Sequence, residues 1–176
     1  ANFIEEGECK INLLQCRPFQ VQETSATPVP LPEIEEDDIV IHATGAVIGH
    51  SRFVTIDKLI FVVPQKYGKL PEKDRYEVAE IIGKLTHSKE HDNKNIMIMG
   101  PGRWGTSTPS LGVPVNFSEI HNVSIICEID TMHEGLIPDL SLGTHFFNEM
   151  VEMNMLYIAY FVEREGNIFN QDFLMN

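Results

Sequence analysis

The sequence predicts an α/β domain in which a central mixed sheet is flanked by helices, while an α+β arrangement also fits the pattern. Short apolar runs typical of buried strands alternate with two segments whose apolar residues repeat with a helical period. A strand-like segment at the start of the chain is separated from these runs by residues rich in proline and acid. The predicted organisation is therefore a detached strand, a linker and one α/β domain.

The first segment, "CKINLLQCRPFQVQ" at residues 9–22, predicts a strand that Pro18 should end, because proline donates no hydrogen bond to a ladder. Alternating prolines at positions 28, 30 and 32 lead into an acidic run at residues 33–38, which predicts a solvated tether without regular structure. We therefore divide the chain into the last strand of one domain (residues 1–20), a linker (21–37), the α/β domain (38–165) and a tail (166–176).

Within the α/β domain, residues 38–64 predict two or three strands broken by glycines, and residues 71–87 predict a helix. The apolar face of this helix should consist of Val78, Ile81, Ile82 and Leu85. Further strands are expected at residues 94–100, 122–130 and 155–162, with a helical turn at 116–120 and a second helix at 141–154. The apolar residues expected to pack in that helix and in the tail are Phe146, Phe147, Met150, Val151, Phe169 and Phe173.

Composition and charge narrow the class of protein. With 176 residues, of which 43% are hydrophobic, the chain is long enough for one well-buried core. Its formal net charge of −13 repels phosphate backbones, so no nucleic-acid partner is expected. No apolar run of membrane-spanning length and no signal peptide are recognised, so no membrane partner is expected. Three cysteines without metal-type spacing favour a reducing cytoplasm and predict no metal site.

Gln15 and Arg17 stand two apart in the predicted first strand, so their side chains should project to the same face. An amide and a guanidinium placed in this way could contact a polyphosphate, although a surface arginine on an edge strand is the more common explanation. The surrounding segment, "FIEEGECKINLLQCRPF", resembles the last strand of the ATP-grasp, nucleotide-binding domain of pyruvate phosphate dikinase and phosphoenolpyruvate synthase. The resemblance implies that Gln15 and Arg17 lie at the ATP phosphates.

Two later segments, residues 99–120 and 142–161, resemble the carboxy-terminal region of a subgroup of the same proteins. This implies that the chain is the carboxy-terminal portion of a phosphotransferase that uses ATP and Mg²⁺ and is completed by the rest of its own polypeptide. Alone, the chain is expected to bind no cofactor and to be inactive. His50 stands in "ATGAVIGHSRF", which departs from the family's T-G-G-x-x-S-H motif, so it is not expected to carry phosphate. The alternative is a non-catalytic docking or oligomerisation module of a larger protein.

Residues 100–112, which we call the glycine loop, follow an apolar run and contain the single tryptophan of the chain. Such glycine density indicates a sharp turn or the close approach of another group. The loop matches neither a Walker motif nor a dinucleotide-binding motif, but with its small hydroxyl residues it could form an anion nest. One interpretation is therefore a ligand or partner surface; the other is a structural corner in which the tryptophan covers the edge of the core. The residues concerned are Gly100, Gly102, Arg103, Trp104, Gly105, Thr106 and Ser107.

Two further side chains could carry chemistry. His145 lies near the start of a predicted helix, where the helix dipole disfavours a protonated imidazole. Glu128 shares a strand face with Asp130, and such a pair could bind a metal or act as acid and base. A packed histidine and a solvated sheet face explain these residues without any function.

The segment at residues 1–22 carries apolar side chains that need cover once it is removed from its own sheet. We expect it to pair with a sheet edge, either of this chain or of a neighbouring copy. Gln15 and Arg17 would then stand outside a nucleotide-binding arrangement in this chain. Pairing with a neighbouring copy would produce a homo-oligomer by strand addition.

Overall fold

Five strands form the central sheet of the computed structural model, which describes residues 2–5, 8–10, 33–88, 94–132, 140–142 and 144–175. In sheet order they are β4 (Val47–Ile48), β8 (Leu156–Tyr160), β7 (Ile125–Ile129), β6 (Ile96–Pro101) and β5 (Lys58–Phe61). β5, β6, β7 and β8 run parallel, whereas β4 pairs antiparallel with β8. The sheet is mixed and flanked by helices, so the predicted α/β class is confirmed.

The strands β6 and β7 are apolar because both of their faces are covered. Every residue of β7 is buried, and in the register of the sheet Ile98 of β6 lies beside Ile126. Parallel strands covered on both faces have near-continuous apolar sequences rather than alternating ones. Glu128 is the exception within β7, and it marks the site described below.

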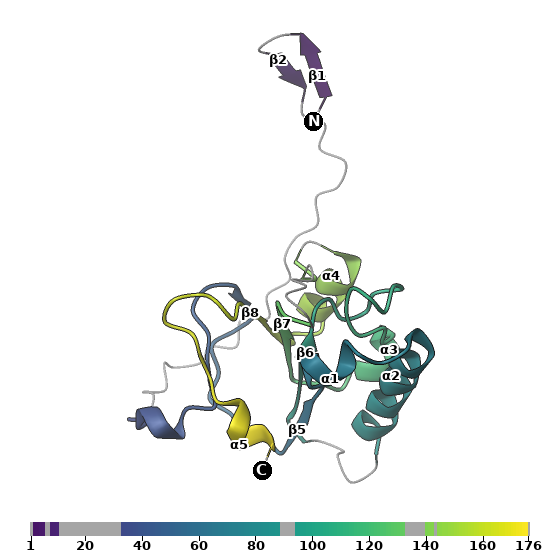
Figure 1. Ribbon diagram of the computed structural model, residues 1–176. Helices are drawn as coiled ribbons and strands as arrows, with labels where there is room; N and C mark the ends of the chain where they lie inside the picture. Colours follow the sequence, from purple (N-terminus) through teal and green to yellow (C-terminus); the bar gives the residue numbers. More distant parts are fainter. Residues whose placement is uncertain are drawn as a thin grey trace.

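The helices α1 to α4 lie together on one side of the sheet, as Figure 1 shows. α1 (Pro64–Tyr67) and α2 (Glu72–Thr86) connect β5 to β6, α3 (Phe117–Ile120) connects β6 to β7, and α4 (His145–Glu152) precedes β8. From β5 to β8 the order in the sheet follows the order in the chain, so right-handed crossovers place all these helices on the same face. The core on this side includes Ile82, Ile98, Trp104, Ile126 and Met150.

Both predicted helices are present, but α2 buries a different stripe from the one expected. Its buried residues are Ala79, Ile82 and Thr86, whereas Ile81 and Leu85 are exposed. The predicted apolar face was therefore wrong at Ile81 and Leu85. The reason is tertiary, because α3 packs against the stripe of α2 that contains Thr86, whose hydroxyl donates a hydrogen bond to the carbonyl of Glu119.

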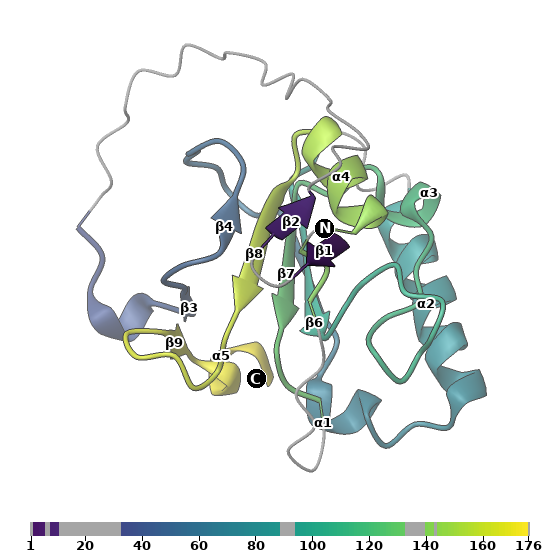
Figure 2. The same cartoon turned by 90° about the horizontal axis from the view of Figure 1, so that it is seen from above.

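The opposite face of the sheet is covered by the beginning of the α/β domain and by the tail. β3 (Ile41–His42) pairs antiparallel with β9 (Ile168–Phe169), and α5 (Gln171–Met175) follows β9 (Figure 2). Phe169 and Leu174 pack against the buried residues of this face, which are Met99, Cys127, Ile129 and Tyr160. The tail is thus ordered through Phe169, as expected, but Phe173 is 66% exposed.

The beginning of the chain forms a hairpin where a single strand was expected. β1 (Asn2–Glu5) pairs antiparallel with β2 (Glu8–Lys10). Residues 11–32 lie outside the described residues, so the expected pairing of this segment with a sheet edge is not tested there. In the acidic run, all side chains of residues 33–38 are exposed as expected, but Glu36–Asp38 form a short 3-10 helix (η1) instead of irregular chain.

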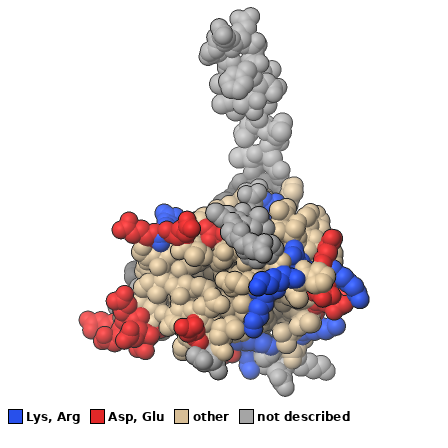
Figure 3. All heavy atoms as spheres, viewed as in Figure 1, with Lys and Arg blue, Asp and Glu red and all other residues tan. Residues whose placement is uncertain are grey.

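Charge is unevenly distributed over the surface. Figure 3 shows acidic side chains gathered at the end of the molecule that holds η1, and basic side chains mixed with acidic ones over α1 and α2. Among the residues that the structure describes, no helix has the length and apolar character needed to cross a membrane.

Candidate functional site

The glycine loop leaves the carboxyl end of β6 and folds back on itself. Gly112 faces Arg103 so closely that a Cβ atom on Gly112 would lie 1.9 Å from the Arg103 carbonyl oxygen. A Cβ atom on Gly105 would lie 2.2 Å from the ring of Phe146. Glycine is required at both positions because protein groups occupy the space that a side chain would need. The close approach that the sequence predicted is therefore made by the protein itself.

Four successive backbone N–H groups of the loop are used inside the protein. Three donate to carbonyl oxygens at 2.8–3.0 Å, and the fourth, that of Trp104, donates to a carboxylate oxygen of Glu128 at 2.8 Å. The three carbonyl pairs are Gly102 with Ile129, Arg103 with Leu111, and Gly105 with Val113. An anion nest needs such donors to be free, so residues 102–105 do not form one.

Trp104 is fully buried in the core on the helix side of the sheet. An exposed tryptophan beside Arg103 would have suited a docking surface, but the indole has no exposed area. The loop is therefore a structural corner in which Trp104 fills the core. Its Nε1–H has no hydrogen-bond partner within the described part of the chain.

Thr106 and Ser107, the hydroxyl residues that follow, also take structural positions. The Thr106 side chain is buried, and its Oγ1 accepts a hydrogen bond from the backbone N–H of Thr108 at 3.1 Å. Ser107 is exposed, and its carbonyl accepts from the hydroxyl of Tyr76 at 3.3 Å. Neither interaction leaves a group of convergent donors for an anion.

Beneath the glycine loop lies Glu128, whose side chain has no exposed area. Oε1 accepts hydrogen bonds from the Trp104 N–H at 2.8 Å and the Ser141 hydroxyl at 2.5 Å. Oε2 accepts from the Ser141 N–H at 2.6 Å and the Tyr157 hydroxyl at 2.8 Å. We call Glu128, Trp104, Ser141 and Tyr157 the Glu128 cluster. It joins β7 to the glycine loop, to the segment before α4, and to β8.

Two opposing effects act on the protonation of Glu128. Burial raises the pKa of its carboxyl, the four donated hydrogen bonds lower it, and the net direction is upward. The pKa of Tyr157 is raised as well, by burial and by the nearby Glu128 charge. Because Glu128 is closed off from solvent, it cannot reach a substrate from this position. Its carboxylate instead satisfies buried donors on three segments of the chain.

Asp130, just beyond the end of β7, does not share these partners. It is half-buried, and its Oδ1 accepts a hydrogen bond from the backbone N–H of Val162 at 2.8 Å. The explanation of Glu128 and Asp130 as a solvated face was wrong for Glu128. An acid and base pair is not supported either, since each carboxylate is occupied by a different part of the protein.

Sequence reasoning missed four residues that hold the glycine loop. Ser141 and Tyr157 supply donors to Glu128, and the Tyr67 hydroxyl donates to the Gly112 carbonyl at 2.7 Å. Arg75 of α2 donates to three backbone carbonyls, those of Gly68, Leu70 and Pro109, and its guanidinium lies 5.5 Å from the centre of the Tyr67 ring. No local pattern could identify these contacts, because most of them join residues far apart in the chain.

The remaining predicted residues are not brought to this cluster. His145 is exposed as the first residue of α4, and Thr144, not His145, accepts the capping hydrogen bond from the Phe147 N–H. Gln15 and Arg17 lie outside the described residues.

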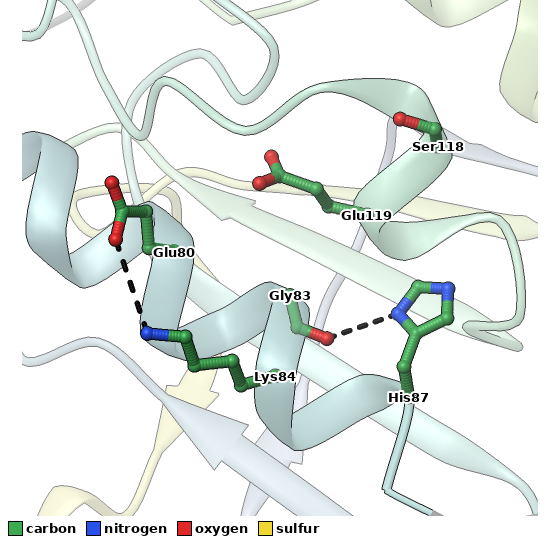
Figure 4. Close-up of a pocket in the computed structure, with 6 residues that line it drawn as sticks. All are labelled: Glu80, Gly83, Lys84, His87, Ser118 and Glu119. Carbon is green, nitrogen blue, oxygen red and sulfur yellow. Dashed lines mark hydrogen bonds and ion pairs between the residues drawn. The ribbon is translucent and has the colours of Figure 1, made fainter.

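Among the residues that the structure describes, no group of three or more His, Cys, Asp and Glu side chains is arranged to hold a metal ion. A shallow groove between α2 and α3 is lined by Glu80, Gly83, Lys84, His87, Ser118 and Glu119 (Figure 4). It is built from different residues than the Glu128 cluster.

Comparisons of the chain with models of protein families, with curated proteins and with solved structures found no match.

Proposed function

We propose that the chain is the carboxy-terminal part of an ATP-dependent phosphotransferase similar to pyruvate phosphate dikinase and phosphoenolpyruvate synthase. The observation that carries this proposal is the segment "FIEEGECKINLLQCRPF" at residues 3–19. Gln15 and Arg17 would contact the ATP phosphates, where a guanidinium can bind two phosphate oxygens at once. The β1–β2 hairpin, at residues 2–10, overlaps the start of this segment and ends before Gln15 and Arg17.

In this proposal the α/β domain takes no direct part in phosphate transfer, which needs ATP and Mg²⁺ held by the rest of the protein. Its glycine loop uses the N–H groups of residues 102–105 internally, and Glu128, the one fully buried acid among the described residues, is enclosed by donors. The domain would therefore be a companion to the catalytic domains, and the chain alone would be inactive.

A docking or oligomerisation module is the second candidate. Trp104 is buried and so cannot contribute to the docking face expected at the glycine loop. The exposed apolar residues that favour this candidate instead flank α4, namely Leu142 at 42% exposure and Met153 at 52%. A module of this kind would associate in proportion to protein concentration and would not respond to nucleotide.

The proposal is tested in the full-length protein with Arg17→Ala, which removes the proposed phosphate contact. Losing a charge-assisted hydrogen bond should lower kcat/KM for ATP by roughly 10- to 100-fold. Arg52→Ala is the matched control, because it removes an arginine whose guanidinium donates to the Asn154 carbonyl within the α/β domain. Equal kinetics for Arg17→Ala and Arg52→Ala would refute the assignment of Arg17.

The isolated chain supplies a second test. It should release no phosphate from ATP with Mg²⁺ above the level of a heat-treated sample. ATP turnover by the isolated chain would overturn the companion role, whereas sedimentation that depends on protein concentration and not on ATP would favour the docking module.

A further inference from the structure

Two histidines end neighbouring helices on the helix side of the sheet. His87 follows the last turn of α2, and its Nδ1 lies 2.9 Å from the carbonyl oxygen of Gly83. His121 follows α3, and its Nδ1 lies 2.8 Å from the carbonyl oxygen of Ser118. A carbonyl oxygen only accepts, so both Nδ1 atoms carry the hydrogen. Each neutral ring therefore keeps its free lone pair on Nε2.

The two imidazoles lie close together, with ring centroids 5.0 Å apart and a tilt of 52°. Their backbones are fixed by contacts between α2 and the end of α3. The buried Thr86 hydroxyl donates to the Glu119 carbonyl at 2.6 Å, and the Asn122 side chain donates to the Thr86 carbonyl. The spacing of the pair is thus set by the fold, while both rings are exposed to solvent.

The surroundings of the pair favour a cation. Each ring follows the carboxyl end of a helix, where the backbone carbonyls create a negative potential. Figure 4 shows His87 beside the groove between α2 and α3, with the Glu119 carboxylate on the α3 side. Lys84 also lines the groove, but its ammonium is turned toward Glu80, 3.9 Å from the Glu80 carboxylate.

We propose that His87 and His121 chelate one divalent transition-metal ion, such as Zn²⁺, through their Nε2 atoms. Histidine ligands whose Nδ1–H donates a hydrogen bond to a backbone carbonyl are typical of metal sites, because that hydrogen bond fixes the tautomer and the ring orientation. With a Zn–N distance of about 2.0 Å and tetrahedral angles, the centroids of two ligating rings lie about 5 Å apart. The observed centroid spacing of 5.0 Å agrees with this value.

The site has two protein ligands, so water fills the other metal positions and the metal exchanges readily. The described residues contain no third His, Cys, Asp or Glu arranged to complete the set. A bound ion would link the carboxyl end of α2 to that of α3. This inference is independent of the proposed phosphotransferase function, since neither histidine belongs to the proposed nucleotide site.

The test is titration of the full chain with Zn²⁺, followed by calorimetry for stoichiometry and by long-range ¹H–¹⁵N spectra of the histidine rings. We expect one ion per chain and a change at Nε2 of two rings, which in the metal-free protein show the tautomer protonated at Nδ1. His87→Ala and His121→Ala should each weaken binding by at least about tenfold. His145→Ala is the matched control, because it removes an exposed histidine from the start of α4.

If either variant folds poorly, the spectra of the unmodified chain still test the proposal, because they report the tautomers and the Zn²⁺ response of its histidines directly. Rings protonated at Nε2 without metal, or a Zn²⁺ response confined to other histidines, would overturn the proposal. Unchanged affinity in a folded His87→Ala, His121→Ala double variant would overturn it too.

Discussion

The two faces of the central sheet share the same strands but differ in polarity. On the helix side, β7 places Ile126 and then Glu128, whose carboxylate accepts four hydrogen bonds. On the other side, the same strand places Cys127 and Ile129, which pack with Met99 and Tyr160. Glu128 therefore needs hydrogen-bond donors while its neighbours Cys127 and Ile129 need apolar contacts, because side chains alternate between the faces.

The difference lies in what covers each face at the carboxyl end of β7. Trp104 and Ser141, which come from connecting segments on the helix side, bring two backbone N–H groups and a hydroxyl to Glu128. The other face is covered by β9 and α5, whose Phe169 and Leu174 supply apolar surface only. A buried acid is tolerated where connecting segments need an acceptor. On the apolar side, burial and the nearby Glu128 charge raise the pKa of the Cys127 thiol to about 12, so the thiol stays neutral there.

The largest effect should come from removing the acceptor on the helix side. Glu128→Ala leaves four buried donors without their acceptor and opens a cavity beneath the glycine loop, so the free energy of unfolding should fall by about 4 kcal/mol. Glu128→Gln keeps one acceptor oxygen but turns an NH₂ group toward donors, so about 2 kcal/mol should be lost. Chemical denaturation measures both losses.

Glu149→Gln, on the exposed side of α4, is the control for Glu128→Gln and should leave stability nearly unchanged. If Glu128→Ala were as stable as this control, the cluster would not organise the loop.

Removing a tyrosine hydroxyl from β8 should lower the stability by a smaller amount. The loss should differ between Tyr157 and Tyr160, which face opposite sides of the sheet. Tyr157→Phe removes a hydroxyl that donates to Glu128 at 2.8 Å, and should cost about 2 kcal/mol because the acceptor is a buried carboxylate. Tyr160→Phe is the matched change on the other face, where the hydroxyl makes no hydrogen bond within the described part of the chain, and should cost about 0.5 kcal/mol or less. Equal losses in thermal or chemical unfolding would show that the faces do not differ in this way.

Local sequence pattern was sufficient for the main strands and the two longer helices of the α/β domain, and insufficient for the short elements and for the polar contacts between elements. The strands at β6, β7 and β8 follow from short apolar runs, and α3 forms within residues 116–120, where a helical turn was expected. The burial of Glu128 could not be foreseen, because Trp104, Ser141 and Tyr157 are 13–29 residues away from it in the chain.

The glycine loop and α2 show the same limit. The sequence indicated that something approaches the loop glycines, but not that the Arg103 carbonyl is what excludes a side chain at Gly112. Ile81 and Leu85 fit a helical apolar face by spacing alone, yet the position of α3 decided which stripe of α2 became buried.

The last effect is a pH dependence confined to the helix side. Burial raises the pKa of Glu128 above its ordinary value of 4.5, so the native state holds a proton at pH values where the unfolded chain has released it. Because the native state then binds more protons, the stability contributed by Glu128 is greatest at low pH and falls as the pH rises from 4.5 through the raised pKa, by at most about 1.4 kcal/mol per pH unit.

The geometry of Ser141 is compatible with such a proton. When Glu128 is protonated, the Ser141 hydroxyl accepts that proton instead of donating to Oε1, and its own hydrogen can be donated to the Trp104 carbonyl, 3.2 Å from Oγ. Glu128→Gln has no proton to release, so the advantage of the natural protein over this variant should shrink as the pH rises. Urea denaturation of both proteins between pH 4.5 and about 8 measures the difference. A constant difference across that range would mean that Glu128 is ionised in the native state throughout, with its four donors outweighing burial.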